Sequence, residues 1–227
     1  MENPTPLTES IEESLEKVME RAPAACNVTP FPEDKTTLQP FSDDEQVRRS
    51  MIWAGVSKKY AGCTFDNFKG NQNLIDVLKA MSTTNESIVL IGNTGCGKTH
   101  LAVSMLRESG NGYDAVFITV PELLLKIRSC FRDGATESEE EIIGRYAQAK
   151  VLILDDLGAE KSTAYSITTL YLIIDRRIQQ ERRTIITTNL TMEQIEDSLG
   201  ARIASRLSEM KIIKIGMADY RKKRAAV

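Results

Sequence analysis

The strongest chemical signal in the sequence is a glycine-rich segment that ends in lysine and threonine. It lies between an apolar segment at residues 87–91 and apolar residues at helical spacing at 100–106. A strand, a glycine loop and a helix in this order are typical of a phosphate-binding loop, where backbone N–H groups and the helix N-terminus surround phosphate oxygens. The residues of this loop are Gly92, Asn93, Thr94, Gly95, Cys96, Gly97, Lys98 and Thr99.

The last two residues of the loop carry its specific chemistry. We expect the Lys98 ammonium to reach the β- and γ-phosphates of ATP, and the Thr99 hydroxyl to hold Mg²⁺. The alternative is a chance glycine turn between a strand and a helix. That interpretation is disfavoured because every fixed position of the pattern is present in the right context.

Two carboxylates follow the apolar segment 151–154. In a phosphate-loop protein, an acid at such a strand end directs Mg²⁺. We therefore expect Asp155 to help bind the metal and Asp156 to orient and polarise the attacking water. A strand that ends in ordinary polar turn residues is the alternative.

Further polar candidates stand near the C-terminus. Asn189 follows the predicted strand 184–188, where its amide could hold the attacking water or instead cap the next helix. Arg202 and Arg206 lie four residues apart and would share one helix face. Two aligned guanidinium groups can clamp a phosphate, although a solvated helix face explains the same spacing.

The elements that must position these residues alternate along the chain. Strands are predicted at 87–91, 115–119, 151–155, 184–188 and 212–215, with helices between them. This alternation predicts an α/β fold with a five-stranded parallel sheet. A helix beginning at Pro121 should place Leu123, Leu124, Ile127 and Phe131 on its apolar face, and an acidic helix should end near residue 147.

The first part of the chain differs in composition from the rest. Residues 1–45 contain 11 acids and 3 bases, whereas the remainder carries a net charge of +5. Short helices are predicted at 8–21 and 42–54, joined by a proline-rich linker at 23–41. We therefore predict a partner-docking arm at 1–55 and an ATPase domain at 56–227, although a solvated acidic tail would show the same charge.

Composition excludes several other classes of protein. The 227 residues include no apolar run long enough to span a membrane, and the N-terminus lacks the basic and apolar regions of a secretory signal. The four cysteines form no C-x-x-C pair, which disfavours a zinc ribbon or a disulfide framework and favours a cytoplasmic location. His100 is the only histidine, so Ser-His-Asp chemistry has no second histidine available.

The order of the motifs resembles a known family. Ile-Gly-Asn-Thr-Gly-Cys-Gly-Lys-Thr, Leu-Ile-Leu-Asp-Asp, Ile-Ile-Thr-Thr-Asn, Ala-Arg-Ile-Ala-Ser-Arg-Leu and Asp-Tyr-Arg occur in sequence. They resemble the bacterial and phage helicase-loader ATPases of the DnaC/DnaI type, to which the transposition ATPase IstB is similar. The resemblance covers about residues 57–222 and implies an AAA+ fold.

The resemblance implies roles for individual residues. Asn189 corresponds to the sensor residue. Arg206 corresponds to the arginine finger, which contacts the ATP bound by a neighbouring subunit, and Arg202 is a lesser candidate for this role. The helices of 121–147 correspond to an insertion that lines a path for single-stranded DNA, where the cations are Lys126, Arg128 and Arg132. Two departures from the AAA+ pattern are Asp156 in place of glutamate and the expected absence of a helical lid. Arg221 is the only substitute for the sensor arginine that such a lid carries.

The resulting functional prediction is an ATP-dependent loader or regulator of a replicative DnaB-type helicase. Its ligands would be ATP, Mg²⁺ and single-stranded DNA. The arm would bind the helicase, and self-association would create shared ATP sites. The alternatives are a transposition helper ATPase similar to IstB, a small nucleotide kinase with the same loop, and an ATP-binding adaptor that does not hydrolyse ATP.

Overall fold

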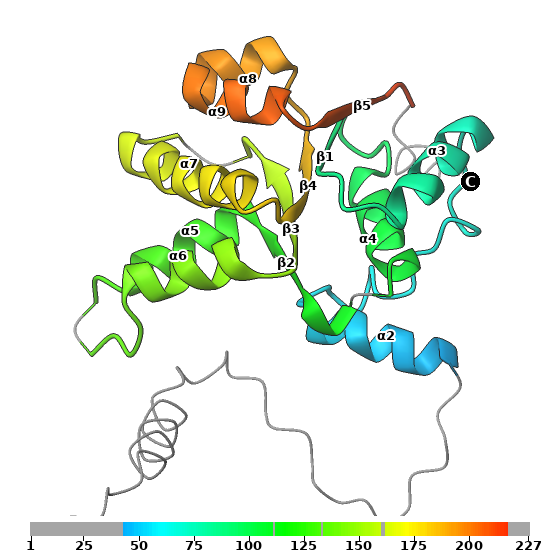
Figure 1. Cartoon of the computed structure of the whole chain (residues 1–227), viewed down its shortest axis with the longest axis horizontal. Coiled ribbons are helices and arrows are strands. Elements are labelled where there is room, and N and C mark those ends of the chain that lie inside the picture. The colour runs from blue at the N-terminus through cyan, green and yellow to red at the C-terminus, as the bar shows by residue number, and fades with distance from the viewer. Residues whose placement is uncertain (1–42, 111, 133, 160–161, 218–227) are drawn as a thin grey trace, which may run out of the picture. The chain divides into compact units, whose positions relative to one another are not determined.

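The computed structural model describes residues 43–110, 112–132, 134–159 and 162–217. Its centre is a five-stranded sheet in which every strand pair is parallel (Figure 1). The order across the sheet is β2-β3-β4-β1-β5. The strands are β1 (Ile88–Gly92), β2 (Ala115–Thr119), β3 (Val151–Leu157), β4 (Arg183–Thr188) and β5 (Lys211–Ile215).

The predicted α/β fold with a five-stranded parallel sheet is confirmed. All five strands lie where the apolar segments indicated, within two residues at each end. Strands β1 and β4 are buried almost throughout, which explains why neither shows the alternation of a half-buried strand. Strand β1 is apolar, and β4 is β-branched at every position after Arg183.

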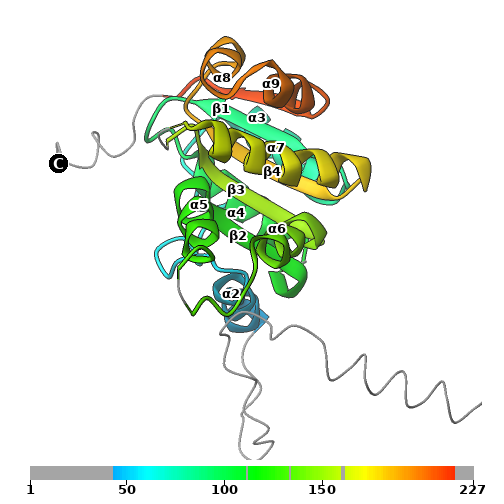
Figure 2. The same ribbon diagram turned by 90° about the vertical axis from the view of Figure 1, so that its left-hand side faces the viewer.

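Helices cover both faces of the sheet (Figure 2). One face carries α3 (Gln72–Ser82) and α4 (Lys98–Glu108), and the other carries α5 (Val120–Ser129), α6 (Glu139–Gln148) and α7 (Ala164–Gln179). The short helices α8 (Met192–Leu199) and α9 (Ala201–Ser208) pack against each other, and α9 contacts α7. A single 3-10 turn, η1 (Gly112–Asp114), precedes β2.

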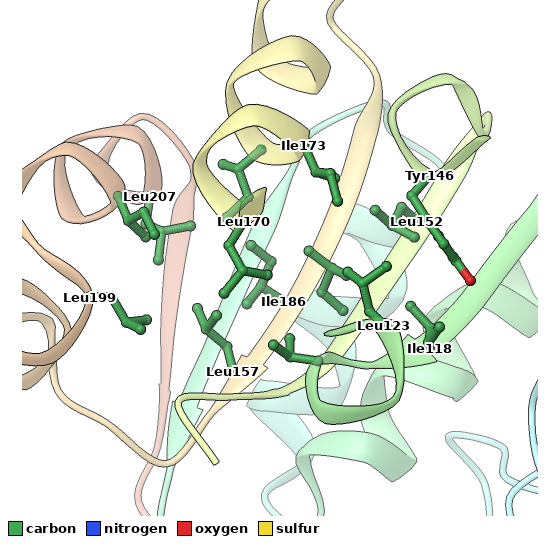
Figure 3. Close-up of a cluster of buried hydrophobic side chains, with 14 of the residues drawn as sticks. Ile118, Leu123, Tyr146, Leu152, Leu157, Leu170, Ile173, Ile186, Leu199 and Leu207 are labelled. Atoms are coloured by element: carbon green, nitrogen blue, oxygen red, sulfur yellow. The ribbon is translucent and has the colours of Figure 1, made fainter. Parts of the chain in front are cut away.

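Two apolar layers hold these helices on the sheet. The layer beneath α5–α9 joins side chains of the sheet to those of the helices, as Figure 3 shows for Leu152 and Ile186 of the sheet and Leu170 and Ile173 of α7. The second layer lies between α3, α4 and the opposite face, and includes Leu90. The carboxyl ends of the strands are therefore held in fixed relative positions by packing on both sides.

Side-chain caps set where several helices begin. Ser138 and Glu141 form a capping box at α6, and Thr191 and Gln194 form another at α8. A Ser or Thr oxygen accepts from a backbone N–H that has no partner within the helix, which stabilises the helix start by about 1 kcal/mol.

Two details of the helices differ from the sequence prediction. Phe131 was expected on the apolar face of its helix, but α5 ends at Ser129 and the Phe131 side chain is 64% exposed. The prediction was wrong because it extended helical spacing past the end of the helix. Helix α3 was not predicted at all, although its buried residues Ile75 and Leu78 have helical spacing.

Helix α2 (Asp43–Trp53) matches the helix predicted at 42–54 and packs against η1 and α4 of the α/β domain. Met51 and Ala54 are buried in the layer that contains α4, and the Phe117 N–H donates to the Ala54 carbonyl at 2.6 Å. An ion pair joins Arg107 to Asp44. The helix predicted at 8–21 and the linker at 23–41 lie outside the described residues, as does Arg221.

Candidate nucleotide site

The phosphate-binding loop connects β1 to α4, as its sequence predicted. Gly97 has φ +96° and precedes the first residue of α4. A side chain there would be strained by this backbone conformation and would also meet the Phe68 ring, 2.5 Å from the position of a Cβ atom. No side chain caps this helix start, so its N–H groups are free to face phosphate oxygens.

Lys98 is oriented by three oxygen atoms. Its Nζ donates to the Gly92 and Asn93 carbonyls at 2.8 and 3.0 Å, and to Asn189 Oδ1 at 2.6 Å. The side chain is only 5% exposed. The ammonium is thus held between the first residues of the loop and the residue that follows β4.

Asn189 contacts the loop and does not cap the next helix. The N-cap of α8 is Thr191, whose side chain accepts from the Gln194 N–H. From the sequence, the Asn189 amide could either face the nucleotide or cap the next helix. The structure brings Asn189 to Lys98 because β4 lies directly beside β1 in the sheet.

Asp155 and Thr99 also come together across the sheet. The Thr99 hydroxyl lies 2.9 and 3.0 Å from the two carboxylate oxygens of Asp155. Burial raises the pKa of Asp155, and the charge of Asp156 adds to this effect, while hydrogen bonds from Thr187 and Thr99 and the charge of Lys98 oppose it. Because burial disfavours the ionised form of this carboxyl group, a nearby cation would stabilise it.

Thr187 connects the two acids, and its role was not predicted from the sequence. Its hydroxyl donates to Asp155 Oδ1 at 2.6 Å and accepts from the Asp156 N–H at 3.0 Å. The register between β3 and β4 shifts here, since Leu154 pairs with Ile186 and Leu157 with Thr188. Two residues of β3 therefore oppose one of β4, and the extra residue forms a β-bulge.

Asp156 adopts a left-handed conformation in this bulge, with φ +57°. Such a conformation is uncommon for a residue other than glycine and costs on the order of 1 kcal/mol or more. The bulge changes the direction of the chain between the two acids. Asp155 is 4% exposed, whereas Asp156 is half-buried.

The residues at this edge fit ATP with Mg²⁺. The free N–H groups of α4 and the Lys98 ammonium suit phosphate oxygens. The Thr99 hydroxyl and the buried Asp155 carboxylate are oxygen donors of the kind Mg²⁺ prefers, and a divalent cation would offset the cost of burying that carboxylate. Asp156 and Asn189 flank the same strand ends.

Phe68 and His100 lie beside the loop, with the Phe68 ring next to Gly97. Their rings are 5.2 Å apart, and His100 Nε2 lies 2.9 Å from the Thr64 carbonyl. Burial lowers the pKa of His100. The lone histidine therefore acts as a packed, neutral helix residue that ties Thr64 to α4.

Arg206 and Arg202 lie on α9, away from this set of contacts. Arg206 forms ion pairs with Asp175 of α7 and with Glu209, at 2.6 and 2.7 Å. Arg202 is exposed. None of the contacts described for Arg206 joins it to the phosphate-binding loop of its own chain.

The three cations predicted to contact DNA are exposed on or just after α5: Lys126, Arg128 and Arg132. The structure adds two aromatic residues beside them. The Phe131 and Tyr165 rings meet edge to face, 5.9 Å apart, and both are exposed, by 64% and 38%. The sequence placed Phe131 in the core, so this exposed pair could be found only from the structure.

Among the described residues, no helix is long and apolar enough to cross a membrane. No group of three or more acidic, histidine or cysteine side chains in that part of the chain could hold a metal by itself. A magnesium ion at the Thr99–Asp155 pair would thus need further oxygen ligands.

Comparisons with known proteins find relatives of this chain. The replicative helicase loader DnaC of Escherichia coli (strain K12) is 27% identical over 173 residues, covering 71% of this chain and 69% of that protein. DnaC of Buchnera aphidicola subsp. Baizongia pistaciae is 25% identical over 189 residues, covering 78% and 77%.

Solved structures show the same fold. The crystal structure of the DnaC helicase loader matches with a TM-score of 0.62 and 21% identity, over 71% of this chain and all of that chain. AMPPCP-bound DnaA from Aquifex aeolicus matches with a TM-score of 0.61 and 20% identity, over 75% and 56%. The IstB-like ATP binding protein family matches residues 44–226. This chain, an α/β fold with a phosphate-binding loop, therefore belongs to the IstB-like ATP-binding proteins.

Proposed function

We propose that this protein is an ATP-dependent loader or regulator of a replicative DnaB-type helicase. The observation that supports it most is the set of contacts joining Lys98 to Asn189 and Thr99 to Asp155, in a chain similar to DnaC over 71% of its length. We infer a helicase as the partner because that relative is named a replicative helicase loader.

The site supports a hydrolytic role for each of its side chains. Lys98 would bind the β- and γ-phosphates, and Thr99 and Asp155 would hold Mg²⁺. Asp156 would polarise a water that Asn189 helps to position. Arg206 of a neighbouring copy would supply positive charge to the transferred phosphate, a contribution of about 10³–10⁵ in rate.

Single-stranded DNA binding is supported by the surface at the end of α5. Lys126, Arg128 and Arg132 provide charge for phosphates, and the Phe131–Tyr165 pair offers exposed ring faces for bases. The backbone N–H of Phe131 donates to the Arg128 carbonyl, so the chain that carries this ring continues one turn past the end of α5. Charge and aromatic surface together are typical of sequence-tolerant binding to single strands.

The DNA proposal is tested with a fluorescent oligothymidylate. Replacing the three cations by alanine should weaken binding and make its dependence on salt shallower, by about 0.7 in slope for each phosphate that is no longer neutralised. Replacing Phe131 or Tyr165 by alanine should cost about 1–3 kcal/mol at any salt concentration. Lys79→Ala, on α3 across the sheet, is the control and should bind normally. Equal binding by all variants would locate the DNA elsewhere.

The helicase proposal is tested by capture of the DnaB-type helicase of the organism that carries this gene. The full chain with ATP should retain the helicase and place it on single-stranded DNA. Lys98→Ala should lose ATP binding and, with it, loading. Wild-type protein that binds ATP but neither retains nor loads the helicase would contradict the proposal.

A transposition helper ATPase is the second candidate, because the matching family is described as IstB-like. Both candidates use the same nucleotide site, so the partner separates them. Capture of a transposase in place of a helicase would favour this alternative.

A further inference from the structure

The guanidinium group of Arg206 is held on two sides by its own chain. Its Nε forms an ion pair with Asp175 Oδ1 at 2.6 Å, a buried oxygen that accepts no well-aligned hydrogen bond from the described residues, and its Nη1 donates to Glu209 Oε1 at 2.7 Å. Hydrogen bonds to Glu209 and Tyr171, followed by the charge of Asp175, raise the pKa of Arg206. The side chain nevertheless remains 34% exposed, so part of the group faces outward.

The two acids that contact Arg206 differ in burial. The Asp175 side chain is 14% exposed, and its Oδ2 accepts from Gln179 Nε2 at 2.7 Å, which fixes the carboxylate on α7. The Glu209 side chain is 45% exposed and lies just past the end of α9. An ion pair anchored in a partly buried position orients its partner, whereas an exposed pair exchanges readily with water.

We propose that Asp175 is a positioning residue that directs Arg206 toward the ATP site of a neighbouring copy. This inference rests on the proposed function, in which Arg206 completes that site. A guanidinium group binds an oxyanion best through two parallel N–H bonds. With Nε beside Asp175, the edge formed by the two Nη atoms is the one that phosphate would bind, in competition with the hydrogen bonds to Glu209 and Tyr171. Glu209 occupies part of that edge and must give way to phosphate.

The test uses mixtures of two full-length chains. Lys98→Ala cannot hold ATP but supplies Arg206, and Arg206→Ala holds ATP but supplies no finger. An equimolar mixture with ATP, Mg²⁺ and oligothymidylate should recover ATP turnover that neither chain shows alone. Asp175→Asn is then added to one chain or to the other.

On the Lys98→Ala chain, Asp175→Asn should lower the recovered kcat by about 10- to 100-fold, the cost of misplacing a catalytic group by about 1 Å. The KM for ATP should stay within about twofold, because the ATP site of the other chain is intact. On the Arg206→Ala chain, the same substitution has no finger to misplace and should leave recovery within about twofold. Glu209→Gln on the Lys98→Ala chain should raise kcat, since a competitor for Nη1 is removed.

Equal losses from Asp175→Asn on either chain would show a merely structural role, and no loss on the Lys98→Ala chain would also overturn the inference. If the Asn variant melts early, Asp175→Glu keeps the charge and should again lower recovery only from the Lys98→Ala chain. A parent mixture that recovers no turnover would instead refute the shared ATP site of the proposed function, and the inference with it.

Discussion

At the scale of single residues, the acids of β3 depend on a hydroxyl group from the neighbouring strand. Thr187 is fully buried, and its hydroxyl bridges the Asp155 carboxylate and the Asp156 N–H. Its hydrogen bond lowers the pKa of Asp155 and so opposes the effect of burial. Thr187 therefore favours the ionised form of Asp155, which a bound Mg²⁺ would require.

We predict that Thr187→Val will weaken Mg²⁺-dependent ATP binding by about 10- to 100-fold, as removal of a partner behind a metal ligand does. The pKa of Asp155 should rise further, so the effect should be larger at lower pH. Titration of a fluorescent ATP analogue with and without Mg²⁺ measures the effect.

Thr188→Val is the matched control. Thr188 is also buried and makes two hydrogen bonds, to the Leu157 carbonyl and from the Leu190 N–H, but it contacts neither acid. It should reduce thermal stability to a similar degree and leave the Mg²⁺ dependence intact. If Mg²⁺ enhanced ATP binding equally in the two variants, Thr187 would not have the role proposed for it.

At the scale of elements, a buried arginine joins α6, α7 and β4. Arg177 is fully buried, and burial lowers its pKa to about 9. Its guanidinium donates to the Tyr146, Ala147 and Ala149 carbonyls at 2.8, 3.2 and 2.7 Å. Further bonds reach the Thr184 hydroxyl and the Arg183 carbonyl. The group thus satisfies carbonyls at the end of α6, where the helix has no N–H partners left.

We predict that Arg177→Met will lower the free energy of unfolding by at least about 3 kcal/mol, because several buried acceptors lose their donor at about 1–3 kcal/mol each. Chemical denaturation measures the change. Arg176→Met, at the partly exposed neighbouring position, should change stability by no more than about 0.5 kcal/mol. A stable Arg177→Met protein would mean that water can replace the guanidinium group.

At the scale of the whole molecule, the contacts of α2 change how the predicted docking arm should be tested. Residues 43–54 pack on the ATPase body through Met51 and Ala54, so a truncation that removes them would also damage the core. Residues 1–42 of the predicted arm lie outside the described residues.

Deleting residues 1–42 should abolish helicase capture while ATP binding and the melting temperature stay close to wild type. Deleting residues 1–54 should lower the melting temperature as well, since it exposes the apolar surface under α2. Calorimetry and the helicase capture assay measure the two effects separately. Helicase capture by a stable chain lacking residues 1–42 would show that the ATPase body itself binds the helicase.

The sequence alone determined the fold class, the five strands and the phosphate-binding loop. These features are local: apolar β-branched runs, glycines at fixed spacing and a lysine at a helix start are all visible in short windows. The candidate acids and Asn189 were also predicted, because polar residues directly after buried strands must lie at one edge of a parallel sheet.

Only the tertiary structure decided how these residues meet. Strand β4 lies between β1 and β3, so Asn189 reaches Lys98, and the β-bulge sets Thr187 between the two acids. The same holds for the ion pair of Asp175 with Arg206 and for the exposed Phe131–Tyr165 pair, which join helices distant in sequence. Sequence periodicity describes one element at a time, whereas these contacts depend on strand order, register and where each helix ends.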